Sequence, residues 1–293
     1  MSAAVPALDR PRPAVPPAVR RHRFLVAVAT HSGLIACSVL FLAPFAFIVL
    51  TALMNDLQAG GQNLWPHPFR WGNFATVIHS FPVLRYAANT FLYAGLATIG
   101  VLLSSVPVAY ALAKLRWRLR GFFFVLVLAT MMLPYQVTAV SLYVIFTRVH
   151  WIGTLLPLIV PNFFGDAFSI FLLRQFFMTI PEDYLDAARV DGGSDFQILR
   201  RVVVPMARPA LAAVALFNFL YAWNDFFGPL LYVINNQANW TLSVALTQFR
   251  TLHRVEWNLT MAAVVLVMLP VIALFFFAQR AFIEGVTLTG VKG

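Results

Sequence analysis

The most constraining feature of this 293-residue sequence is a set of long apolar runs without charged residues. Four runs contain no Asp, Glu, Lys or Arg over 32, 28, 27 and 23 residues: Phe24–Asn55, Tyr86–Ala113, Gly121–Thr147 and Trp257–Gln279. A helix needs about 20 mostly apolar residues to cross the hydrocarbon core of a bilayer. Because backbone polar groups in that core must be satisfied within their own segment, each run is predicted to be a transmembrane helix.

Two further runs of suitable length are interrupted by charged side chains. Ile152–Phe177 contains Asp166 and Arg174, and Pro209–Leu231 contains Asp225. The sequence therefore predicts an all-α integral membrane protein with six transmembrane helices. The composition agrees, since 60% of the residues are hydrophobic and only 11% are charged, whereas charged residues make up about a quarter of a soluble globular domain.

The basic residues gather on one side of the predicted membrane. Of the 21 Lys and Arg residues, 16 fall on one side: 15 lie before the first span, between spans 2 and 3, between spans 4 and 5, or after span 6, and Arg174 lies near the end of span 4. Excess Lys and Arg marks the cytoplasmic side, so we expect both termini to be cytoplasmic. The net charge of +10 then reports topology, and no nucleic-acid partner is expected.

The sequence divides into three predicted parts. Residues 1–23 are rich in proline and arginine and are expected to form a disordered cytoplasmic arm. Residues 24–282 form the six-helix membrane domain, and residues 283–293 form a cytoplasmic C-terminal tail. The single cysteine, Cys37, excludes an intrachain disulfide and is expected to be buried.

A polar loop, residues 179–205, separates spans 4 and 5 and holds five of the eleven acidic residues. Thr179 and Glu182 have the spacing of a capping box, which predicts a helix of about eleven residues. Gly192-Gly193 is predicted to end that helix. Ser194 and Gln197 form a second capping-box pattern, so the loop is expected to fold as helix, glycine turn and helix.

The first helix of the polar loop is too short to be stable alone in water. Its apolar side chains Tyr184, Leu185 and Ala188 must therefore contact something. One interpretation is packing against the helix's own bundle or the lipid headgroups. The alternative, which we favour, is that the helix docks a soluble subunit.

Polar side chains inside the spans are the candidates for a translocation path, because such residues are costly in a membrane and usually face the bundle interior or water. The candidates are Tyr135, Gln136, Asn162, Asn218, Tyr221 and Asn224. Each of them can instead bond a neighbouring helix. For Asp225 that packing role is the stronger interpretation.

The sequence contains no recognisable catalytic constellation. Its six histidines are scattered without metal-ligand spacing. Gly285–Lys292 lacks the adjacent Gly-Lys-Ser/Thr of a phosphate-binding loop. We therefore expect a non-enzymatic chain that binds no cofactor itself and takes its energy from a partner.

One motif in the polar loop resembles a known family. Asp186-Ala187-Ala188, three residues, Gly192, nine residues and Val202-Val203-Val204-Pro205 is similar to the signature loop of permease subunits in binding-protein-dependent ABC importers. The family has Glu for Asp186, Ile for Val202 and Leu for Val204. Trp223-Asn224-Asp225-Phe226 and the ending Gly285–Gly293 resemble the carbohydrate branch, which includes maltose-type and glycerol-phosphate-type importers.

The resemblance implies an ABC type I importer permease fold in a bacterial or archaeal inner membrane. It implies as partners a second permease in a heterodimer, two copies of an ABC ATPase that bind ATP and Mg, an extracytoplasmic solute-binding protein and membrane lipid. The implied ATPase-coupling segment runs from Glu182 to Gly193, and within it Asp186, Ala187, Ala188 and Gly192 match the family motif. The ATPase-contacting tail residues are Gly290, Val291, Lys292 and Gly293.

The implied cargo is a sugar or sugar-like solute. Alternatives are another polar solute, such as a polyamine or phosphorylated polyol, or an ion-coupled secondary carrier with Asp166 and Asp225 as cation ligands.

Overall fold

A computed structural model describes residues 17–61, 64–80, 82–249 and 255–290. The described part is helical and contains no β-strand. Its long helices are α1 (Pro17–Ala52), α4 (Val83–Ala113), α5 (Arg120–Met131), α6 (Tyr135–Arg148), α8 (Ala167–Thr179), α12 (Arg208–Asn224) and α15 (Trp257–Gly290). Between them lie the shorter elements α2 (Asp56–Ala59), α3 (Gly72–Ser80), α7 (Leu156–Ile159), η1 (Val160–Phe164), α13 (Phe227–Tyr232), η3 (Gln237–Asn239), α14 (Leu242–Ala245) and η4 (Leu246–Phe249).

By length and composition, four helices could cross a membrane, and the number is six if each of two bent helix pairs forms one span. Four are Arg23–Ala52, Val83–Ala113, Leu156–Thr179 and Trp257–Phe276, and two are helix pairs bent by 92° and 81°. The first pair is α5 with α6, and the second joins the helical segment Asp195–Met206 to α12. This agrees with the predicted all-α, six-helix membrane protein.

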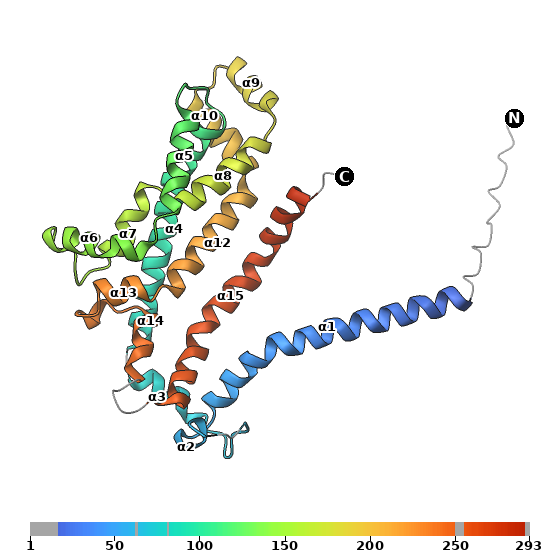
Figure 1. Cartoon of the computed structure of the whole chain (residues 1–293), viewed down its shortest axis with the longest axis vertical. Helices are drawn as coiled ribbons and strands as arrows, with labels where there is room; N and C mark the ends of the chain where they lie inside the picture. Colours follow the sequence, from blue (N-terminus) through green and yellow to red (C-terminus); the bar gives the residue numbers. More distant parts are fainter. Residues whose placement is uncertain (1–16, 62–63, 81, 250–254, 291–293) are drawn as a thin grey trace, which may run out of the picture.

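The central helix of the bundle is α4, which packs against α8 and α12, while α15 packs against α12 and α3 (Figure 1). One close approach is made at Gly100, where an added Cβ would lie 2.7 Å from the Phe163 ring. A larger residue there would have to displace the Phe163 ring, because η1 lies directly on α4.

The first helix differs from the prediction in two ways. It begins at Pro17 rather than after residue 23, so residues 17–23 are helical and not part of a disordered arm; residues 1–16 lie outside the described residues. Cys37 is exposed and not buried, because most of α1 projects away from the rest of the chain (Figure 1). The buried part of α1 is its C-terminal end, at Thr51 and Ala52.

The third span breaks at Pro134, where the sequence predicted only a kink. Helix α5 ends at Met131, Pro134 is extended with ψ 136°, and α6 leaves at 92°. Proline has no N–H for the helical ladder and disfavours helical geometry in the residue before it. Only Met132, Leu133 and Pro134 lie between the two helices, so the chain turns a corner and does not bend smoothly.

The fifth span also ends earlier than predicted. Helix α12 stops at Asn224, whereas the apolar run continues to Leu231. Asp225 is extended, and its carboxylate accepts the backbone N–H of Gly228 at 3.1 Å. A local side-chain bond of this kind competes with helix continuation, so a separate helix, α13, begins at Phe227.

Candidate functional site

The polar loop forms a compact helical cap at the end of the bundle opposite α2 and α3 (Figure 1). It contains α9 (Glu182–Val190), α10 (Asp195–Ile198), the π-helical segment η2 (Leu199–Val203) and α11 (Val204–Met206). The predicted order of helix, glycine turn and helix is therefore confirmed. The first helix has nine residues rather than about eleven.

The start of α9 differs from the prediction. Pro181, not Thr179, is the N-cap, and the Thr179 hydroxyl donates to the Phe176 carbonyl within α8. The reason is Pro181, which disfavours helical geometry at the preceding residue. Ile180 is accordingly extended, with ψ 123°, so the capping box predicted for Thr179 and Glu182 does not form.

The end of α9 and the second capping box follow the prediction. Gly192 has φ +81°, the left-handed region that favours glycine. At Gly193 an added Cβ would lie 2.8 Å from the Ala188 carbonyl oxygen, so this position also requires glycine. Ser194 accepts the Gln197 N–H and Gln197 accepts the Ser194 N–H, which begins α10.

One side of α9 is anchored in the bundle. Leu185 is fully buried in a cluster that includes Val101, Phe177 and Ile198. On the other side Tyr184 is 55% exposed, and Asp186 and Ala187 are also exposed. The packing interpretation thus applies to Leu185, which packs on the chain's own core, whereas Tyr184 points away from that core.

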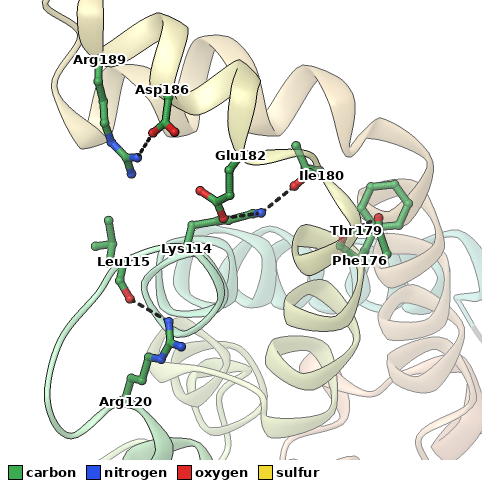
Figure 2. Close-up of polar contacts among 9 residues, drawn as sticks. All are labelled: Lys114, Leu115, Arg120, Phe176, Thr179, Ile180, Glu182, Asp186 and Arg189. Atoms are coloured by element: carbon green, nitrogen blue, oxygen red, sulfur yellow. Dashed lines mark hydrogen bonds and ion pairs between the residues drawn. The ribbon is translucent and has the colours of Figure 1, made fainter.

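Two ion pairs lie at α9 (Figure 2). Lys114 Nζ lies 2.9 Å from Glu182 Oε1, and Arg189 Nη1 lies 2.7 Å from Asp186 Oδ1. The hydrogen bond from Arg189 to Asp186 raises the pKa of the guanidinium above its ordinary value. Both partners of that second pair are partly exposed, so its contribution to stability is small, about 0–1 kcal/mol.

A cleft of about 700 Å³ separates α9 from the turn between α4 and α5. Its lining residues are Lys114, Leu115, Arg116, Trp117, Glu182, Asp186, Arg189 and Asp195. Exposed apolar side chains, Tyr184, Val190 and Phe196, lie on the polar loop itself. The cleft is therefore lined mainly by charged side chains, and the exposed apolar side chains lie on the loop beside it.

Two of the six path candidates bond within the bundle. The Asn218 amide donates to Ser169 Oγ on α8 and to the Val214 carbonyl, both at 2.9 Å. The Asn162 amide donates to the Leu158 carbonyl at 2.8 Å. The Asn218–Ser169 bond is the neighbouring-helix contact weighed as the alternative to a path role, whereas the bonds to Val214 and Leu158 lie within the residue's own helical segment.

The other four path candidates lie near the two helix breaks. The Tyr135 hydroxyl donates to the Tyr232 hydroxyl at 2.8 Å, which joins the start of α6 to α13. Gln136 is exposed, and Tyr221 is 72% exposed. Asn224 is also exposed, and its amide donates to the Leu220 carbonyl at 2.7 Å.

The predicted C-terminal tail is described only in part. Residues 283–290 continue α15, so the tail is helical as far as Gly290. Val291, Lys292 and Gly293 lie outside the described residues.

A profile of one family covers more than half of the chain. The family is described as "Binding-protein-dependent transport system inner membrane component", and it matches residues 105–287, which include the entire polar loop. The chain belongs to this family. It is therefore a multi-pass permease component of an ABC importer.

Relatives of this chain are named as permeases for carbohydrates or related solutes. The chain is 34% identical over 192 residues to the arabinooligosaccharides transport system permease protein AraQ of Halalkalibacterium halodurans, covering 66% of this chain and 68% of that protein. It is 31% identical over 268 residues to the sn-glycerol-3-phosphate transport system permease protein UgpE of Yersinia enterocolitica, covering 87% and 94%.

The fold matches a solved transporter of the same kind. A chain from a bacterial ABC transporter involved in the import of the acidic polysaccharide alginate superposes with a TM-score of 0.75 at 24% identity, covering 92% of this permease and all of that chain. At that level of identity the match establishes the ABC type I importer permease fold alone.

Two residues that support the polar loop have no structural role predicted from the sequence. Lys114 and Arg174 entered the sequence interpretation only through the charge distribution and, for Arg174, as an interruption in a span. Lys114 directly follows an apolar run, and Arg174 precedes a loop rich in acidic residues, and these positions were the available signal.

Proposed function

We propose that this permease forms, with a second permease, the path by which a sugar or sugar-like solute enters a bacterial or archaeal cell. Two copies of an ATPase subunit would dock on the polar loop, and a solute-binding protein would deliver the cargo on the opposite side. ATP and Mg would be bound by the ATPase and not by this chain. Both termini and the polar loop would then face the cytoplasm.

The proposed docking role is supported by the difference between the two faces of α9, one buried and one exposed. Leu185 fixes the helix to the bundle, while Tyr184, Asp186 and Ala187 present an outward surface. A force applied to that surface would pass through Leu185 to the cluster containing α4 and α8. Coupling of this kind needs different contacts in two states, not a covalent step.

Co-purification of the ATPase with the assembled complex tests the docking role. Ala187→Trp places a bulky side chain on the exposed surface of α9 and should abolish retention of the ATPase. Ala75→Trp is the matched control, because Ala75 is exposed on α3 at the opposite end of the bundle. Equal ATPase retention by the two variants would remove α9 as the docking element.

The carbohydrate assignment rests on the names of the relatives. Uptake of an arabinooligosaccharide and of sn-glycerol 3-phosphate by cells that carry the complete transporter distinguishes a sugar from a phosphorylated polyol. A polyamine is the third cargo to compare.

The ion-coupled carrier is disfavoured by the contacts of its two proposed ligands. Asp166 Oδ2 accepts the Ser169 N–H at 2.7 Å as the N-cap of α8. Asp225 Oδ2 accepts the Tyr93 hydroxyl at 2.9 Å. Inhibition of uptake by vanadate, with persistence under an uncoupler, is the result expected for ATP-driven transport.

A further inference from the structure

Lys114 is a buried cation at the junction between the membrane bundle and the polar loop. The residue is 6% exposed and forms the C-cap of α4. Its Nζ donates to the Ile180 carbonyl at 2.6 Å and to Glu182 Oε1 at 2.9 Å (Figure 2). A buried ammonium is costly unless it is paired and hydrogen-bonded, so these two acceptors are what permits Lys114 to lie there.

The two acceptors flank the corner at which α9 begins. Ile180 is the C-cap of α8, and Glu182 is the first residue of α9. Pro181 lies between them and has no N–H with which to form a backbone bond across the corner. Lys114 thus connects α4 by hydrogen bonds to the residues on both sides of the α8–α9 corner.

A second cation, Arg174, connects the helices that surround Lys114. Arg174 Nε on α8 donates to the Leu112 carbonyl near the end of α4, at 3.2 Å. Its guanidinium carbon lies 3.9 Å from the centroid of the Phe124 ring on α5. Arg174 therefore ties α8 to α4 and α5, and Lys114 extends that connection to α9.

We propose that Lys114 is a positioning residue that sets the orientation of α9 for the ATPase. Leu185 and Ala188 hold the middle of α9 through apolar packing, which is non-directional and restrains the helix orientation less than a hydrogen bond does. The directional contacts from Lys114 to Ile180 and Glu182 oppose rotation of the helix. The orientation of α9 is a property of this chain alone, whereas its use in coupling rests on the proposed function.

The orientation of α9 is tested by a spin-label distance measurement on the full chain. Labels are placed at Asp183 on α9 and at Leu119 on the α4–α5 turn, both exposed, in a protein with Cys37→Ser. Lys114→Met should convert one narrow distance distribution into a broad one. Arg118→Met is the matched control, because Arg118 is an exposed cation on the same turn, and it should leave the narrow distribution unchanged.

Glu182→Met provides the same measurement should Lys114→Met fail to fold. The 48% exposed Glu182 side chain can be changed without opening a cavity, and the change removes one of the two acceptors of Lys114. A narrow, unshifted distribution in this variant or in Lys114→Met would overturn the positioning role.

The second measurement of this experiment is the retention of the ATPase by the assembled complex. We expect Lys114→Met to lower the affinity for the ATPase by about tenfold and Arg118→Met to preserve it. A broadened α9 distribution together with full ATPase retention would overturn the proposed docking function instead, while the positioning role would stand.

Discussion

Tyr93 on α4 donates its hydroxyl hydrogen to the carboxylate of Asp225, 2.9 Å away, at the break between α12 and α13. The second carboxylate oxygen accepts the Gly228 N–H at 3.1 Å, and the Asp225 carbonyl accepts the Ser243 hydroxyl at 2.6 Å. Asp225 thus joins α4, α13 and the segment containing α14. The packing interpretation of this residue follows from these contacts.

Loss of the Tyr93 hydroxyl should destabilise the bundle. Tyr93→Phe removes one donor to a partly buried carboxylate, which costs about 1–3 kcal/mol, and the melting temperature of the purified chain should fall. Tyr143→Phe is the control, because the Tyr143 ring stacks on Tyr232 and its contact survives removal of the hydroxyl. Equal melting temperatures for the two variants would contradict the structural role of the Tyr93–Asp225 bond.

The turn after α9 should tolerate only residues that accept a left-handed backbone. Gly192 has φ +81° and no neighbour within 4 Å of an added Cβ, so the restriction is conformational and not one of space. Asparagine enters this region more readily than other residues. We therefore expect Gly192→Asn to retain the ATPase and Gly192→Trp to lose it, measured by co-purification. Normal transport by Gly192→Trp would separate this turn from coupling.

The sequence predicts those features of the fold that depend on one continuous segment better than those that depend on contacts between distant residues. Charge-free runs such as Tyr86–Ala113 correspond closely to observed helices, because burial in a bilayer is decided by composition along one segment. The break after α12 was not predicted, since it depends on the carboxylate of Asp225 bonding Gly228 and Tyr93. Tyr93 lies 132 residues away in sequence, and no local pattern pairs the two.

The candidate coupling surface was predictable from motif spacing, but its support was not. Gly192 occupies the required turn, whereas the burial of Lys114 depends on α4, α8 and α9 meeting. The capping error at Thr179 was avoidable, because Pro181 alone makes Ile180 a poor first helical residue.

The membrane topology can be measured directly. In a protein with Cys37→Ser, single cysteines at Gly61 and Ser194 should react with a membrane-impermeant maleimide from opposite sides of intact cells. Gly61 lies beyond α2 and Ser194 at the start of α10, at opposite ends of the bundle (Figure 1). Ser194 should react only after permeabilisation. Reaction of both cysteines in intact cells would contradict a cytoplasmic polar loop.

The path candidates should separate into two groups when uptake is divided by the amount of assembled complex. Asn218 bonds Ser169 across α12 and α8 at 2.9 Å, and removing one partner of such a bond costs about 1–3 kcal/mol. Asn218→Ala should therefore reduce the amount of complex and leave the turnover of the remainder unchanged.

Gln136 is exposed beside the Pro134 break, so its amide is available to water or to a solute. Gln136→Ala should leave assembly intact and lower uptake per complex, because a polar solute loses one hydrogen-bonding group along its route. Gln136→Glu is the companion variant, since it keeps the shape and adds a negative charge, and it should impair an anionic cargo more than a neutral sugar. Unchanged turnover in both Gln136 variants would remove this residue from the path and leave Tyr221, also exposed near the α12–α13 break, as the next side chain to test.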